Sequence, residues 1–152
     1  MYQCILIATD GSTLSRKAVD SGVKLAELTG AEVVALNVIS RYSVSTLPVK
    51  AGVSVEQQRT ESAVAVVEGV KTLAATRGVK VKAVTTRSDM VGESIIAAAK
   101  KYKCDLIVMA SHGRRGLTRL LMGSETTHVL THSHIPVLVL RKFMEVKNGP
   151  SR

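Results

Sequence analysis

The residues best suited to chemistry lie in one stretch, 110–124, which reads ASHGRRGLTRLLMGS. It follows an apolar run at 106–109 that predicts a buried strand, and it ends at Ser124, where a helix is expected to begin. Small residues between a strand and a helix allow backbone N–H groups to face an anion, and the helix N-terminus adds partial positive charge. Three arginines add charged donors: Arg114, Arg115 and Arg119. The stretch therefore predicts a phosphate-binding loop.

The spacing of small residues in this stretch, A-x2-G-x9-G-S, resembles the nucleotide-binding signature of the universal stress protein family, G-x2-G-x9-G-S/T. Ala110 stands in place of the first glycine. The segments ILIATDGS at 5–12 and HIPVLVLR at 134–141 also resemble that family, so the resemblance extends from Cys4 to Arg141. It implies a stress-response protein that binds ATP and acts as a binding or signalling module.

The elements that must position this loop follow from the hydrophobic pattern. Strands are expected at 5–9, 32–39, 79–85, 104–110 and 137–140, and helices at 13–28, 55–76, 91–101 and 124–132. This alternation predicts an α/β domain with a five-stranded parallel sheet and helices on both faces. Together with the resemblance it indicates a Rossmann-like strand order of 3-2-1-4-5, in which ligands bind between the first and fourth strands. We expect one domain, 1–142, followed by a flexible tail, 143–152.

Topology and motif select the same residues as a nucleotide site. Asp10 ends the first strand, where its carboxylate can accept hydrogen bonds from a nucleoside or form a turn before Gly11. Gly113 and Gly123 allow the backbone to approach phosphate, and Ser124 can donate to a phosphate or cap the next helix. With the positions implied by the resemblance, the expected nucleotide-binding set is Ala8, Thr9, Asp10, Val38, Met109, Ala110, His112, Gly113, Arg114, Gly123, Ser124 and Glu125.

The substitution at Ala110 has two interpretations. Its methyl group can crowd a backbone that approaches the ligand, or the position can simply have the ordinary backbone conformation that alanine adopts. Magnesium is expected only as a bridge between bound phosphates. Because the sequence shows no clear general base, at most slow ATP hydrolysis is expected. The alternatives to a binding module are a weak ATP hydrolase and a dimeric interaction protein of the same family that binds no nucleotide.

Composition and charge limit the other classes of function. The chain has 152 residues, 45% of them hydrophobic, with one Phe and no Trp, so the core must consist of Val, Ile, Leu and Ala. A net charge of +9 favours anionic partners, but the basic residues are dispersed and aromatic residues are few, which argues against nucleic-acid binding. No apolar run approaches the ~20 residues of a membrane span, and the first residues predict a strand. We therefore expect a soluble cytoplasmic protein.

Two other enzyme or switch classes share this topology. Pyrophosphate-releasing ligases carry Ser-Gly-Gly-x-Asp-Ser after the first strand, whereas this chain has DGST at 10–13. Response regulators need clustered acidic residues there and a lysine after the fifth strand, but Asp10 stands alone and the fifth strand leads to Arg141. Both classes are therefore disfavoured.

Smaller features leave alternatives open. The irregular stretch 40–53 is either a flexible loop that covers the site or a plain connection. Cys4 and Cys104 precede strands that the family order places side by side, so they form either a redox pair or two buried thiols. His128 and His132 are spaced for a metal, but no further ligand accompanies them.

The last predicted strand indicates self-association. It lies at a sheet edge, where exposed apolar residues would promote aggregation unless another strand pairs with them. These residues are Val137, Leu138, Val139 and Leu140. The resemblance implies pairing with the same strand of a second copy, so we expect a symmetric homodimer.

Overall fold

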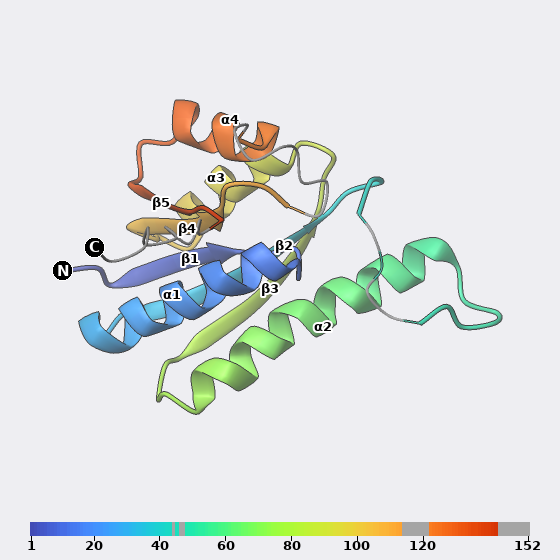
Figure 1. Ribbon diagram of the computed structural model, residues 1–152, viewed down its shortest axis with the longest axis horizontal. Helices are drawn as coiled ribbons and strands as arrows, with labels where there is room; N and C mark the ends of the chain where they lie inside the picture. The colour runs from blue at the N-terminus through green and yellow to red at the C-terminus, as the bar shows by residue number, and fades with distance from the viewer. Residues whose placement is uncertain (44, 46–47, 114–121, 143–152) are drawn as a thin grey trace, which may run out of the picture.

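The computed structural model describes residues 1–43, 45, 48–113 and 122–142. Its strands are β1 (Cys4–Ala8), β2 (Glu32–Ile39), β3 (Val81–Arg87), β4 (Leu106–Ala110) and β5 (Val137–Leu140). Its helices are α1 (Thr13–Thr29), α2 (Val55–Ala75), α3 (Val91–Lys101) and α4 (Ser124–His132). The strands form one parallel sheet in the order β3-β2-β1-β4-β5 (Figure 1). The predicted fold class and strand order are therefore confirmed.

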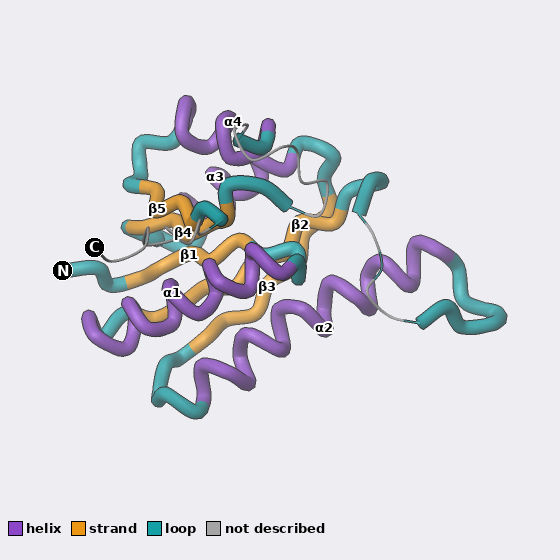
Figure 2. Tube along the Cα trace, viewed as in Figure 1, coloured by secondary structure: helices purple, strands orange, loops and turns teal. Residues whose placement is uncertain are grey.

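Helices cover both faces of the sheet, with α1 and α2 on one face and α3 and α4 on the other (Figures 1 and 2). Successive side chains of a strand point to opposite faces, so Ile5 and Ile7 pack with α1 and α2, while Leu6 packs with α3 and α4. A strand buried on both faces must be apolar at every position. This requirement explains the uninterrupted apolar run of β1.

Two predicted strand boundaries are wrong by two residues at their starts. Val79 donates its backbone N–H to Ala74 O at 3.1 Å, so it completes the end of α2 and β3 begins later, at Val81. Cys104 similarly donates to Ala99 O at 2.8 Å, so β4 begins at Leu106. At its other end β3 extends to Arg87, two residues beyond the predicted end at 85.

The two edges of the sheet differ in chemistry. β3 pairs with β2 and carries the exposed Lys82, as the alternating pattern predicts for an edge. β5 pairs with β4, and its Leu138 is 41% exposed. The predicted tail, 143–152, lies outside the described residues. In the part of the chain that the structure describes, no helix combines the length and the apolar character needed to cross a membrane.

Candidate functional site

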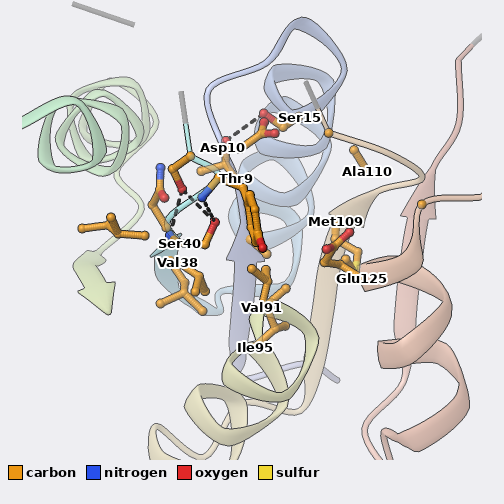
Figure 3. A pocket seen from close by; sticks show the side chains of 18 of the residues that line it. Thr9, Asp10, Ser15, Val38, Ser40, Val91, Ile95, Met109, Ala110 and Glu125 are labelled. Atoms are coloured by element: carbon orange, nitrogen blue, oxygen red, sulfur yellow. Dashed lines mark hydrogen bonds between the residues drawn. The ribbon is translucent and has the colours of Figure 1, made fainter. Parts of the chain in front are cut away.

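A crevice of about 450 Å³ opens where the central strands separate at their carboxyl ends (Figure 3). The register between β1 and β4 ends at Ile7 and Val108, and that between β1 and β2 ends at Ala8 and Leu36. In contrast, β2 pairs with β3 through Ile39. The last residues of β2 thus extend beyond the end of β1 and form a wall of the crevice. This is the position at which parallel α/β sheets bind ligands.

The structure brings eleven of the twelve expected nucleotide-binding residues to this crevice. They are Ala8, Thr9, Asp10, Val38, Met109, Ala110, His112, Gly113, Gly123, Ser124 and Glu125. The twelfth, Arg114, lies outside the described residues, as do Arg115 and Arg119. Segments about 100 residues apart in the chain therefore meet at one place, although their roles toward a ligand remain predictions.

The connection after β1 is held by its own hydrogen bonds. Asp10 Oδ1 accepts from the backbone N–H of Ser12 at 2.9 Å, and Thr9 Oγ1 accepts from the N–H of Gly11 at 3.2 Å. Thr9 Oγ1 and Ser15 Oγ lie 2.9 Å apart. Asp10 is therefore a turn former, and its carboxylate also lines the crevice. The two interpretations of this residue are compatible.

The two motif glycines are needed for close approach. A Cβ atom at Gly113 would collide with Asp10 Oδ2, the tip of a side chain on the opposite wall, so these two residues lie close together across the crevice. Gly123 donates its N–H to Ser111 O at 2.7 Å, and a Cβ there would lie 3.2 Å from that oxygen and 3.3 Å from His112 Cα. A larger residue at either position would therefore push on the opposite wall or on the backbone.

Of the two roles left open for Ser124, the structure does not show the capping of α4. Gly123 occupies the N-cap, Ser124 is the first helical residue, and within the described residues no side chain caps this helix. The Ser124 hydroxyl instead donates to Glu125 Oε2 at 3.0 Å. The backbone N–H groups at the start of a helix are available to an anion when no side chain caps them. Here that helix start borders the crevice.

Ala110 occupies an ordinary strand position. It is 7% exposed, and its carbonyl accepts a hydrogen bond from Thr126 Oγ1 at 2.9 Å. Among the described non-glycine residues, Lys103 is the one with a positive φ, so Ala110 has a backbone conformation that alanine adopts without strain. A glycine is therefore not required here by the backbone.

Several lining residues were not expected from the sequence. Arg59 from α2 reaches the crevice and donates from Nε to Ser43 O at 2.9 Å. Asp89, after β3, accepts from the Arg41 backbone N–H at 2.8 Å and from Arg41 Nε at 2.7 Å. The hydrogen bond from the Arg41 backbone contributes most, and that from its side chain adds to it, so the pKa of Asp89 lies below its usual value. Asn37 also lines the crevice. A polar residue within an apolar strand could have indicated this position from the sequence.

The crevice has an apolar side and a polar side. Val91 and Ile95 lie together opposite Thr9, Asp10 and Ser15, and Met109 lies on a further wall beside Glu125 (Figure 3). The described residues that line the crevice include three carboxylates, Asp10, Asp89 and Glu125, and one guanidinium, Arg59. A ligand with a flat apolar ring and a hydroxylated or charged portion matches this division.

The histidines of α4 are arranged as a local pair. The rings of His128 and His132 stack with their centroids 4.2 Å apart, and His132 Nδ1 lies 3.0 Å from His128 O. The described residues contain no group of three or more side chains of the types that bind metals. This pair is explained by packing and a local hydrogen bond.

Comparison with known proteins identifies the family. Residues 1–141 match the universal stress protein family. The chain is 34% identical to universal stress protein MJ0531 of Methanocaldococcus jannaschii over 143 residues, covering 93% of this chain and 84% of that protein. The solved structure of MJ0577 from the same organism superimposes with a TM-score of 0.77 at 30% identity, covering 95% of this chain and 99% of the other.

Two more distant solved structures contain nucleotides. A universal stress protein in complex with cAMP has a TM-score of 0.71 at 20% identity, covering 93% of this chain and 99% of its own. One from Archaeoglobus fulgidus in complex with dAMP has a TM-score of 0.67 at 17% identity, covering 92% and 98%. At these identities the likeness concerns the fold. The sequence match across 1–141 and the shared fold together show that this chain belongs to the universal stress protein family.

Proposed function

We propose that this protein binds an adenine nucleotide, ATP in particular, in the crevice and acts in the cytoplasm as a stress-response binding or signalling module. The observation that carries the proposal is the meeting of an apolar wall, Asp10 and an uncapped helix start in one crevice between β1 and β4. The dAMP and cAMP complexes of the two distant relatives support the adenine class. These two complexes contain monophosphates, so binding of the triphosphate is the more specific part of our proposal.

The base is assigned to the apolar side of the crevice. Val91, Ile95 and Met109 offer a surface against which a planar ring can be buried. The strand edge at Val38, beyond the end of β1, offers backbone groups to the ring's polar atoms. Asp10 lies at the polar side, where its carboxylate can accept from ribose hydroxyl groups.

The phosphates are assigned to the start of α4. Its first-turn N–H groups and the helix dipole stabilise negative charge, and Gly123 allows the close approach that this requires. Asp10 and Glu125 repel a bare triphosphate, so a cation at the phosphates favours binding. Magnesium fits this need, because it is commonly held by phosphate oxygens, water and one or two carboxylates. We propose it as a companion of ATP.

Calorimetric titration with a ligand panel tests the proposal. We expect ATP with Mg²⁺ to bind more tightly than dAMP and cAMP, and GTP to bind at least about tenfold more weakly than ATP because the wall at Val38 reads the base edge. Inorganic tripolyphosphate is the control, since a net charge of +9 attracts any polyanion. Equal affinity for tripolyphosphate and ATP, or no binding of ATP, would contradict the proposal. ADP released during the same incubation would add slow hydrolysis to it.

We also propose a homodimer formed through the β5 edge. Within the described residues β5 pairs on one side only, with β4, and its apolar side chains are partly exposed: Val137, Leu138, Val139 and Leu140. Sedimentation velocity at micromolar concentration should give a dimer for the natural chain and a monomer for Leu138→Asp. Leu28→Asp is the matched control, because Leu28 is an 84% exposed leucine on α1. A dimer that survives Leu138→Asp would rule out this edge.

A further inference from the structure

The two cysteines of the chain meet at the end of the sheet opposite the crevice. Cys4 begins β1 and Cys104 precedes β4, and their sulfur atoms lie 3.1 Å apart. Cys4 is partly exposed, whereas Cys104 is 6% exposed and packs into the core between the sheet, α3 and α4. Both are free thiols in this structure. A disulfide requires a sulfur separation of about 2.05 Å, so the pair needs a movement of about 1 Å to bond.

The backbone around both cysteines is held in place by Asp105. Its carboxylate accepts from the N–H of Gln3 at 2.9 Å and from the N–H of Cys4 at 3.1 Å. Its own N–H donates to Cys4 O at 2.9 Å. Cys104 is fixed in turn by the bond from its N–H to Ala99 O at 2.8 Å. The sulfur contact therefore does not depend on a mobile segment, since each side is anchored next to the cysteine.

We propose that Cys4 and Cys104 form a reversible disulfide when the protein meets a peroxide. The Cys4 thiolate attacks one peroxide oxygen, the O–O bond breaks, and the sulfur is oxidised to a sulfenic acid while the peroxide is reduced to water. Cys104 sulfur then attacks Cys4 sulfur, the S–O bond breaks, and the hydroxide leaves as water with the Cys104 proton. A dithiol reductant returns both thiols.

The surroundings of the two sulfur atoms indicate that Cys4 is oxidised first and that Cys104 attacks it second. Burial, with the contact to Cys4 as a further cause, raises the pKa of the Cys104 thiol above its usual value. Cys104 therefore remains protonated and sheltered, and the more exposed Cys4 meets the oxidant first. Cys104 is a slow nucleophile in general, but contact with the sulfur it attacks makes the second step intramolecular.

Mass spectrometry of the oxidised protein tests the proposal directly. Reduced protein is treated with hydrogen peroxide, free thiols are alkylated under denaturing conditions, and trypsin cleaves after Arg16, Lys103 and Arg114. We expect peptides 1–16 and 104–114 to appear as one linked species, lighter than their sum by two hydrogen atoms, within a chain that remains single on a non-reducing gel. Dithiothreitol should separate them. Separately alkylated peptides, or Cys4 as sulfinic acid without the link, would overturn the proposal.

Single substitutions separate the two roles. Cys104→Ser should leave Cys4 as a sulfenic acid that dimedone traps, while Cys4→Ser should leave Cys104 reduced. Oxidation of Cys104 in Cys4→Ser as fast as that of Cys4 in Cys104→Ser would contradict the assigned order. The natural chain provides a second measurement that does not depend on either variant. Because the link closes a loop between residues 100 apart, oxidation should raise its melting temperature by roughly 5 °C or more. An unchanged melting temperature would count against the link.

Discussion

Two of the helices that start beside the crevice, α1 and α4, are built differently, while α3 starts there at Val91 and, like α4, has no side-chain cap among the described residues. α1 follows β1 after a short connection in which Ser12 Oγ accepts from Ser15 N–H at 3.3 Å and Asp10 accepts from Ser12 N–H. α4 follows β4 after the long stretch 111–123, and Gly123 at its N-cap has no side chain to accept from the first turn. Both helix starts border the same crevice.

This difference separates a structural helix start from one available to a ligand. The first-turn donors of a helix must find acceptors, either from the protein or from something bound. At α1 the protein supplies them, with Ser12 as the cap. At α4 the described residues supply no side-chain cap, so an anion gains more there than at α1. The comparison predicts that changes near α4 alter nucleotide affinity, whereas changes to the α1 cap alter stability.

The largest effect is expected from Gly123→Val. The added side chain meets Ser111 O and His112 Cα, so the start of α4 must move away from the end of β4. We expect ATP affinity to fall at least about tenfold in calorimetric titration, with a loss of stability of about 1–3 kcal/mol. Gly69→Ala is the matched control, because nothing lies within 4 Å of a Cβ at this α2 position. It should keep full affinity and gain up to about 1 kcal/mol of stability. A Gly123→Val protein that binds ATP normally would refute the assignment of phosphates to α4.

Two substitutions at Asp10 distinguish its role in the turn after β1 from the role of its negative charge in the crevice. Asp10→Ala removes the acceptor for Ser12 N–H and the carboxylate that lines the crevice, so both stability and ATP affinity should fall. Asp10→Asn keeps an acceptor oxygen and should restore the stability, to within about 0.5 kcal/mol in urea unfolding. If the carboxylate also supports Mg²⁺, the asparagine protein should bind metal-free ATP at least as tightly as the natural chain, because the repulsion is reduced, but should gain less from added Mg²⁺. Identical affinities for all three proteins would show that Asp10 is only a turn former.

The cap of α1 should matter for stability and little for binding. Ser12→Ala removes the acceptor for Ser15 N–H and should lower the free energy of unfolding by about 1 kcal/mol. Ser54→Ala is a close match, since Ser54 Oγ accepts from Gln57 N–H at 3.1 Å at the start of α2. Both proteins should bind ATP within about twofold of the natural chain. A large loss of affinity in Ser12→Ala, absent from Ser54→Ala, would mean that α1 also receives the ligand.

The sequence predicts the architecture and part of the crevice, but not how the start of α4 is capped. The parallel α/β architecture could be predicted because strand and helix patterns alternate regularly, and the strand order was indicated by that alternation together with the family resemblance. Asp10, Gly113 and Gly123 could be placed together because the carboxyl ends of neighbouring strands must meet. The start of α4 at Ser124 was predicted correctly, but the sequence left open whether the Ser124 hydroxyl caps the helix, and the structure shows Gly123 at the N-cap with no side-chain cap among the described residues.

Residues supplied by distant packing could not be predicted. Arg59 reaches the crevice only because of the way α2 lies against the sheet. Asp89 becomes part of the wall through its bonds to Arg41, a residue 48 positions away that no local pattern connects with it. Such contacts depend on the rotation and distance of packed elements, which hydrophobic periodicity leaves undetermined. Asn37 could have been predicted as a site residue, because a polar residue in a buried strand needs a hydrogen-bond partner or a ligand.

The smallest effect is expected from acidification at the Arg41–Asp89 pair, which joins the connection after β2 to the turn after β3. The bonds from Arg41 lower the pKa of Asp89, so folded protein holds the carboxylate charged at pH values where unfolded chain has begun to protonate it. The pair therefore stabilises the fold fully above the unfolded pKa of about 3.9, and this contribution disappears as the pH falls through the lower folded value. Asp89→Asn should lose slightly less stability than the natural chain between neutral pH and pH ~3 in urea unfolding. Because the pair is exposed to solvent, the difference should shrink in ~0.5 M salt, and a difference that grows with salt would exclude this ion pair as its cause.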